Sequence, residues 1–188
     1  MLQNFESIVL IWLGIGFITF ITLLKIPAPY GKFSKTNWGP MIPSKLGWIV
    51  MEIISPLALL YFFLNGNIEK TPTNITFISL WTLHYFNRSV IYPLRLNNPA
   101  KMPLIIAVLA FLFNVMNGYI NGTYFGSIQE YSAEYMSNWN FIVGVCLFII
   151  GAYINIKSDN ILLSLRSKSG EYKIPEGFMF RYVSFPNY

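Results

Sequence analysis

The stretch SIVLIWLGIGFITFITLL (Ser7–Leu24) contains no charged residue and is nearly long enough to cross a lipid bilayer as a helix. A membrane-spanning helix needs about 20 mainly apolar residues, because it rises about 1.5 Å per residue through a hydrocarbon core of about 30 Å. No Lys or Arg precedes this run, and no small-residue cleavage site follows it, so it lacks the pattern of a secretory signal peptide. We therefore expect it to be the first of several membrane spans.

Four more apolar runs of similar length follow along the chain, at Leu46–Leu64, Asn74–Tyr92, Met102–Ile120 and Trp139–Ile156. The chain of 188 residues is 54% hydrophobic and 11% charged, with a mean hydropathy of +0.49. A soluble domain usually has about 25% charged residues. These features predict an all-α fold, a polytopic membrane helix bundle with five transmembrane helices, in a single domain over residues 1–188.

The basic residues alternate from loop to loop, which predicts the orientation in the membrane. Loops rich in Lys and Arg stay in the cytoplasm, so we expect the N-terminus outside and the loops after the first, third and fifth spans inside. The membrane would be the bacterial inner membrane, or the endoplasmic reticulum in a eukaryote. This bias also explains the net charge of +5 and gives no clustered basic face for nucleic acid. The predicted cytoplasmic residues are Lys25, Lys32, Lys35 and Lys45, then Arg88, Arg95 and Lys101, then Lys157, Arg166, Lys168, Lys173 and Arg181; the other loops carry only Lys70.

Ionisable residues inside membrane spans are costly and usually mark a functional site. Glu52 lies roughly 10 Å into the second span, where a protonated carboxyl group would be a hydrogen-bond donor. His84, Tyr85 and Arg88 occur within one turn of the third span, and their spacing predicts one helical face that continues to Tyr92. Each also has a simpler interpretation: a carboxyl paired for packing, an interior histidine, an arginine that extends to the interface, and an interfacial tyrosine.

Two further polar or glycine patterns occur near the ends of spans. Asn155, Asp159 and Arg166 would line one stripe if the fifth helix continued past the membrane, although a solvated helix end explains them equally well. In the fourth span, glycines recur every four residues, which is typical of close helix packing, and three asparagines are expected to bond across helices. These residues are Gly118, Gly122 and Gly126, and Asn114, Asn117 and Asn121.

Several kinds of chemistry are disfavoured. With one His and one Cys, the sequence has no His/Cys cluster for a metal, and no oligomer is implied. The candidate site residues all lie in the predicted cytoplasmic halves of their spans. We therefore expect a pocket that opens to the cytoplasm, with an apolar body and a polar rim.

Several segments together resemble the steroid 5α-reductase (3-oxo-5α-steroid 4-dehydrogenase) family. They occur in family order and are PAPYGKF at Pro27, LHYFNRSVIYPL at Leu83, NG-x-x-NG at Asn117, GAYINIKSDNILLSLR at Gly151 and GEYKIPEGFMFRYVSFPNY at Gly170, with the Glu52-x-x-x-Pro56 element in the second span. The combination is specific, whereas any one segment alone is weak.

The resemblance implies a membrane enzyme of seven helices that uses NADPH to reduce the double bond conjugated to the 3-ketone of a steroid-like substrate dissolved in the lipid. It implies that Glu52 and Tyr85 hydrogen-bond the ketone oxygen. We expect His84 to have a supporting role, in orienting Tyr85 or the cofactor. The resemblance also implies cofactor contacts from Arg88, Asn155, Asp159, Arg166 and Asn187. Because the family continues for two more helices after the PNY motif, we expect a fragment or a C-terminally shortened relative.

Other functions remain open from the sequence. A relative in the same broad family could reduce a polyprenal or an enoyl thioester, and pocket shape would decide between them. A non-catalytic membrane protein or a small transporter is the alternative from a different class. A transport path should have polar residues in both halves of the spans, whereas the titratable residues here favour one half.

Overall fold

The computed structural model describes residues 2–29, 37–96, 101–166 and 173–188, without the side chain of Arg166. The part of the PAPYGKF motif from residue 30 to 33 lies outside these ranges, as do residues 170–172 of the last motif. Lys32, Lys35 and Lys168, which contributed to the predicted orientation, also lie outside the described residues.

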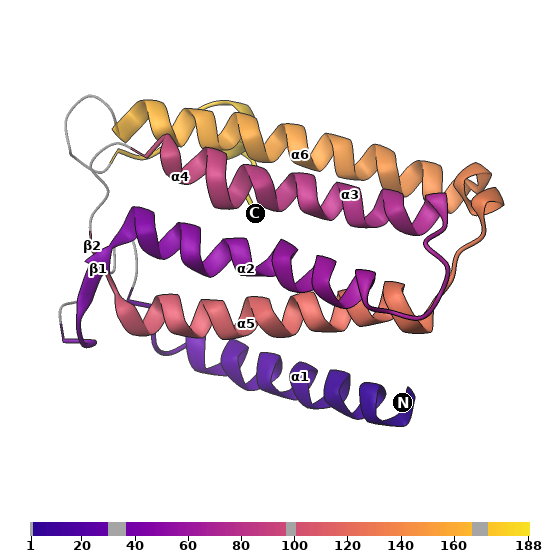
Figure 1. Cartoon of the computed structure of the whole chain (residues 1–188). Helices are drawn as coiled ribbons and strands as arrows, with labels where there is room; N and C mark the ends of the chain where they lie inside the picture. Colours follow the sequence, from indigo (N-terminus) through magenta and orange to yellow (C-terminus); the bar gives the residue numbers. More distant parts are fainter. Residues whose placement is uncertain (1, 30–36, 97–100, 167–172) are drawn as a thin grey trace.

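Helical passages run side by side along one direction (Figure 1). The described helices are α1 (Leu2–Leu23), α2 (Ser44–Leu64), α3 (Pro72–Phe86), α4 (Tyr92–Leu94), α5 (Leu104–Thr123) and α6 (Trp139–Arg166). Four passages are long and apolar enough to cross a membrane: α1, α2, α5 with the turn after it, and α6 to Leu165. The predicted all-α membrane bundle is therefore confirmed.

The predicted third span is helical but not uniform. The 15 residues of α3 continue into a five-residue π-helical turn, Asn87–Ile91, and then into α4. Thr71 caps the start of α3, since its side chain accepts a hydrogen bond from the Asn74 N–H at 3.2 Å. Near the other end, Pro93 lacks an N–H and would crowd the carbonyl four residues earlier in a regular helix. A wider turn relieves that crowding, and π turns are frequent at functional sites.

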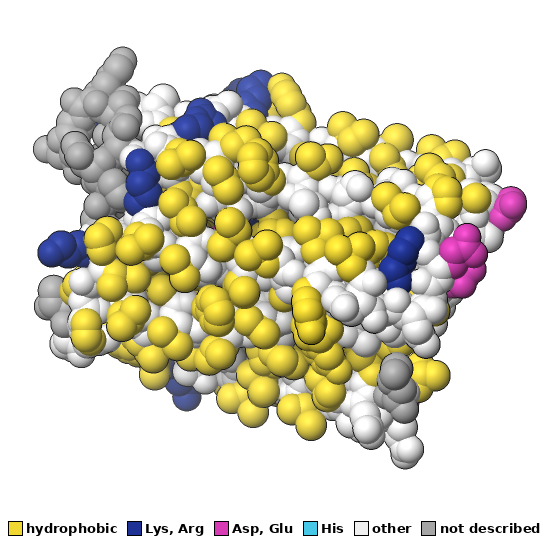
Figure 2. Space-filling view, viewed as in Figure 1, with side chains coloured by type: hydrophobic (Ala, Val, Ile, Leu, Met, Phe, Trp, Pro, Cys, Tyr) yellow, Lys and Arg dark blue, Asp and Glu magenta, His cyan; other side chains and the backbone are white. Residues whose placement is uncertain are grey.

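A two-stranded antiparallel sheet, absent from the predictions, joins two loops at one end of the bundle. β1 (Met41–Pro43) pairs with β2 (Lys101–Pro103), with Ile42 opposite Met102. The sheet holds the loops after α1 and α4 at the same end, as the alternation of basic residues requires. Lys and Arg side chains gather near this end, acidic side chains gather at the other end, and apolar side chains cover the surface between them (Figure 2).

The centre of the bundle is α2. Half of its apolar window is buried, whereas the corresponding window of α1 has no buried residue. The apolar surfaces of α1 and α6 face outward, as expected for helices in contact with lipid. A second π-helical turn, Tyr124–Ile128, follows α5, and short 3-10 turns at Ala133–Ser137 and Phe178–Arg181 complete the described secondary structure.

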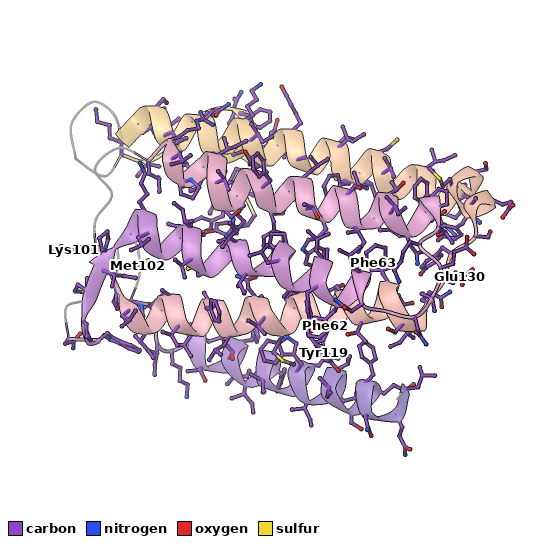
Figure 3. All side chains as sticks on the ribbon, in the orientation of Figure 1. Phe62, Phe63, Lys101, Met102, Tyr119 and Glu130 are labelled. Atoms are coloured by element: carbon purple, nitrogen blue, oxygen red, sulfur yellow. The ribbon has the colours of Figure 1, made fainter. Side chains whose placement is uncertain are left out.

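The predicted close packing of the glycines is confirmed, and their partner is α2. A Cβ atom added at Gly118 would lie 2.6 Å from the Cβ of Ala58, and one added at Gly122 would lie 2.6 Å from the Leu59 carbonyl oxygen. Next to these glycines, the rings of Phe62 and Tyr119 meet edge to face with centroids 4.9 Å apart (Figure 3). The backbones of α2 and α5 can approach this closely only because the glycines carry no side chain.

The three asparagines of α5 only partly match the prediction that they bond across helices. Asn114 Nδ2 donates to the Met51 carbonyl on α2 at 2.7 Å, and Asn117 Nδ2 donates to the Tyr85 hydroxyl on α3 at 3.4 Å. Asn121 instead donates to Asn117 within α5. The prediction is therefore confirmed for two residues and wrong for Asn121.

Candidate active site

A partly buried ion pair joins α2 to the π turn Asn87–Ile91. Arg88 Nε donates to Glu52 Oε1 at 3.0 Å, and the Glu52 side chain is only 8% exposed. The sequence predicted Glu52 as a neutral hydrogen-bond donor and Arg88 as a separate cofactor contact. The structure pairs these two residues: Oε1 of Glu52 accepts from the guanidinium, a hydrogen bond that a carboxylate or the carbonyl oxygen of a neutral carboxyl group can form.

Arg88 lies between two aromatic rings. Its guanidinium carbon is 5.0 Å from the centroid of the Trp48 ring and 5.4 Å from that of Tyr188. A planar guanidinium stacks well on aromatic faces, and partial burial strengthens that attraction. Arg88 is therefore held in place by Glu52 at its Nε atom and by contacts with the rings of Trp48 and Tyr188.

A second polar cluster lies between α6 and the C-terminal segment. Asn155 Nδ2 donates to the Asn187 carbonyl at 2.6 Å, and Asn187 Nδ2 donates to Asp159 Oδ1 at 3.1 Å. Asp159 and Asn187 are 8% and 9% exposed. The predicted i, i+4 stripe of Asn155 and Asp159 is confirmed, and α6 does continue to Arg166, whose side chain lies outside the described residues.

The two clusters meet at a small cavity of about 10 Å³. It is lined by Arg88, Asn155, Asp159, Asn187, Trp48, Asn87, Tyr92 and Tyr188. Among the described residues, the buried Asn187 Oδ1 atom has no hydrogen-bond partner. The cation of Arg88 suits a phosphate, and the carboxylate of Asp159 suits hydroxyl groups. The free amide oxygen of Asn187 and the aromatic faces suit the amide and the rings of a dinucleotide. A site for a drug-sized ligand has roughly 300–1,000 Å³, so a dinucleotide requires this cavity to widen.

Tyr85 lies on the α5 side of α3. Its ring stacks on Trp81, with centroids 5.4 Å apart and planes 21° apart, and His84 meets it edge-on at 5.3 Å. The predicted single face of the third span therefore divides, because Tyr85 contacts α5 while Arg88 and Tyr92 contact Trp48 of α2. The contact with Tyr85 makes His84 a neighbour of the candidate catalytic group.

Helix α5 relates Glu52 to Tyr85. Asn114 donates to the backbone carbonyl of Met51, the residue before Glu52, and Asn117 donates to the Tyr85 hydroxyl. Asn114 and Asn117 are three positions apart in a helix, so their Cβ atoms are about 5–6 Å apart. Met51, next to Glu52 on α2, and Tyr85 on α3 are therefore both bonded to α5 within one turn of that helix.

Three contact residues were not identified from the sequence. Trp48 precedes Glu52 by four positions, so helical spacing from the buried acid would have found it. Asn87 and Tyr188 line the cavity next to two residues that were identified, Arg88 and Asn187, but nothing in their own pattern distinguishes them.

Comparison with known proteins agrees with the sequence motifs. The family model described as 3-oxo-5-alpha-steroid 4-dehydrogenase matches residues 100–188. The steroid 5-alpha-reductase DET2 of Gossypium hirsutum is 39% identical over 178 residues, which cover 90% of this chain and 68% of the relative. The corresponding protein of Arabidopsis thaliana is 39% identical over 181 residues, with coverage of 90% and 68%. The 3-oxo-5-alpha-steroid 4-dehydrogenase 1 of Bos taurus is 33% identical over 183 residues, with coverage of 93% and 70%. The chain therefore belongs to the steroid 5α-reductase (3-oxo-5α-steroid 4-dehydrogenase) family, whose members are oxidoreductases that act on CH–CH groups.

Proposed function

We propose that the protein reduces the carbon–carbon double bond of a 3-oxo-Δ4 steroid or a similar enone within the membrane, with NADPH as the reductant. The main support is family membership together with a buried Glu52 that pairs with Arg88, which lines a cavity with Asn155, Asp159 and Asn187. When bound, NADPH supplies the hydride that reduces the β carbon of the enone.

Tyr85 and Glu52 would act on the ketone oxygen. Hydride addition at the β carbon moves negative charge onto that oxygen, and preorganised donors in a dry site stabilise such charge. Tyr85 can donate its hydroxyl hydrogen directly. Glu52 can donate only when it carries a proton, and that proton must be on the oxygen that does not accept from Arg88, since Oε1 is the acceptor in this pair. A neutral Glu52 could therefore donate to the ketone through Oε2 while Oε1 keeps its hydrogen bond to Arg88.

Arg88, Asn155, Asp159, Asn187 and the continuation of α6 to Arg166 would hold the cofactor. Arg88 would contribute positive charge and a stacking face, and Asp159 would accept hydrogen bonds from hydroxyl groups. The amides of Asn155 and Asn187 can both donate and accept, which suits the carboxamide of a nicotinamide. His84, edge-on to Tyr85, would support the orientation of that ring.

The test is an enone reduction assay in membranes that contain the protein. NADPH oxidation should depend on a 3-oxo-Δ4 steroid, the enone absorbance should fall, and mass spectrometry should find a product with two more hydrogen atoms. Tyr85→Phe and Glu52→Gln should each lower kcat about 100-fold, typical for loss of one donor to an oxyanion, with less change in KM for NADPH. Matched controls are Tyr61→Phe and Glu69→Gln, which alter exposed residues.

Two outcomes would contradict the proposal. The first is that verified full-length protein fails to oxidise NADPH with every enone tested, including a polyprenal and an enoyl thioester. The chain would then be a non-catalytic or transport protein. If both site variants kept normal turnover, the assigned roles of Glu52 and Tyr85 would be wrong. Preference for a polyprenal or an enoyl thioester would keep the reaction type and change the substrate class.

We also propose that the site faces the cytoplasm and the N-terminus lies outside. This is supported by the basic residues at the end of the bundle that carries Lys101, and by the acidic residues at the end that carries Glu130 (Figure 3). In a Cys146→Ser background, single cysteines introduced at Lys101 and at Glu130 can be labelled with a membrane-impermeant maleimide in intact cells or sealed vesicles. Labelling from outside at position 130 and not at position 101 is expected, and the reverse pattern would invert the orientation.

A further inference from the structure

Two asparagines of α5 form a short hydrogen-bond relay that ends at the Tyr85 hydroxyl. Asn121 Nδ2 donates to the Asn117 backbone carbonyl at 2.9 Å and to Asn117 Oδ1 at 3.1 Å. Asn117 Nδ2 then donates to Tyr85 Oη at 3.4 Å. The relay is partly buried between α3 and α5, where water cannot easily replace its hydrogen bonds.

The direction of this relay is fixed by one backbone carbonyl. A backbone carbonyl can only accept, so Asn121 must turn its NH₂ group, rather than its oxygen, toward residue 117. That NH₂ group is also adjacent to the side chain of Asn117, which must therefore present its oxygen. The Asn117 NH₂ group is then left to face Tyr85, and a flipped amide at either asparagine would place two donors or two acceptors together.

The orientation of Asn117 determines what the phenol can do. Because Asn117 donates to the phenol oxygen, Tyr85 is the acceptor in this hydrogen bond and does not donate its O–H to Asn117. The Tyr85 O–H is then free to donate elsewhere, while stacking on Trp81 limits the positions that the ring can take. A donor to the phenol oxygen also makes the phenol a stronger donor itself, since hydrogen bonds in a chain polarise one another.

We propose that Asn117 is a positioning residue that makes Tyr85 a hydrogen-bond donor to the substrate carbonyl, with Asn121 fixing the orientation of Asn117. This inference rests on the proposed function, in which Tyr85 contacts the ketone oxygen. It assigns to two α5 asparagines a function beyond the helix packing that their sequence context predicts.

The first test is a set of kinetic variants. Asn117→Leu should lower kcat about fivefold to tenfold, the effect of losing one neutral hydrogen bond, and leave KM for NADPH unchanged. In a Tyr85→Phe background the same substitution should have no further effect, because it acts through the missing hydroxyl. Independent, multiplicative losses in the double variant would overturn the proposal.

Asn117→Asp gives a sharper test, because it keeps the size of the side chain and reverses its polarity. The new carboxylate would accept the Tyr85 O–H and take that hydrogen from the substrate. We therefore expect a larger fall in kcat than in Asn117→Leu, whereas a residue that only fills space would tolerate the near-isosteric change better. Asn121→Leu should give a smaller fall than Asn117→Leu, since Asn117 could then rotate.

A spectroscopic readout separates this inference from the proposed function. With 3-fluorotyrosine at position 85, the ¹⁹F chemical shift should change in Asn117→Leu and change less in Asn138→Leu, an exposed control. An unchanged chemical shift in Asn117→Leu would contradict the hydrogen bond from Asn117 to Tyr85, whatever the enzyme activity. A changed shift in a protein that reduces no enone would keep the hydrogen bond, contradict the proposed function and, with it, the positioning role.

Discussion

Replacing Gly118 by alanine should force α2 and α5 apart. The added Cβ would lie 2.6 Å from the Cβ of Ala58, 2.8 Å from the Leu59 nitrogen and 2.9 Å from the Ser55 oxygen. Non-bonded carbons prefer about 3.5–4.0 Å, so the contact is about 1 Å too short. Two of the three atoms are backbone and cannot move as a side chain can, which points to the upper part of the roughly 1–3 kcal/mol cost of overpacking.

A helical glycine also costs up to about 1 kcal/mol relative to alanine, which opposes this loss. The net expectation for Gly118→Ala is a destabilisation of about 2 kcal/mol. The free energy of unfolding can be measured by SDS titration in mixed micelles, followed by circular dichroism. The matched control is Gly144→Ala on α6, where nothing lies within 4 Å of the added Cβ, and which should be neutral or slightly stabilising.

The test is whether Gly118→Ala has a lower free energy of unfolding than Gly144→Ala. Ala58→Gly in the Gly118→Ala background should restore part of the loss, because it removes the nearest clashing atom, while the two backbone contacts remain. Equal stability of Gly118→Ala and Gly144→Ala would refute the inferred contact between α2 and α5. A loss that Ala58→Gly leaves untouched would place the strain elsewhere.

Three further changes test other parts of the bundle. Asn74→Ala should destabilise by about 2–4 kcal/mol in the same titration, because the fully buried Asn74 side chain bonds to three backbone groups between residues 125 and 131; a loss below about 1 kcal/mol would contradict this. Arg88→Met should cost about 3 kcal/mol by leaving the carboxylate of Glu52 buried without its cation, and adding Glu52→Gln should recover most of that loss. Burial raises the pKa of Tyr131 to about 12, above its ordinary value of 10.0. The stabilising contribution of Tyr131 is therefore present below pH 10 and disappears as the pH rises toward 12, and Tyr131→Phe should make the alkaline loss of stability less steep over that window.

The helices were largely predictable because long apolar runs leave few alternatives in a membrane. Their ends were less so: α1 begins at Leu2 rather than Ser7, and α6 continues to Arg166, ten positions past the predicted Ile156. Hydropathy locates the part of a helix that needs lipid, but polar residues such as Ser158 and Asp159 can extend the same helix beyond it. The two π turns and the two three-residue strands carry no periodic pattern and depend on contacts between distant segments.

In the candidate site, the sequence likewise predicts individual residues but not the contacts between them. Glu52 and Arg88 could be identified from the sequence because burying an ionisable side chain in a membrane span costs free energy, so such residues usually have a role there. The pairing of these two residues could not be predicted, because it depends on how α2 and the third passage are rotated about their axes. The contact of Asn117 with Tyr85 depends on the same rotations, which explains why the asparagine pattern indicated packing alone.

Arg88 connects the two halves of the candidate site, which has a consequence for how its residues should be studied. Its Nε atom holds Glu52, on the side proposed for the ketone, while its guanidinium plane contacts Tyr188, next to the cluster proposed for the cofactor. Removing Arg88 would leave a buried carboxylate unpaired and also remove a cofactor contact, so KM for both ligands and stability should change together. The separate roles are better resolved by Tyr85→Phe and by Asn155→Leu, each of which alters one half of the site and leaves the ion pair in place. Opposite patterns in this pair of variants, kcat lowered by the first and KM for NADPH raised by the second, would follow only if the two halves have the distinct functions proposed for them.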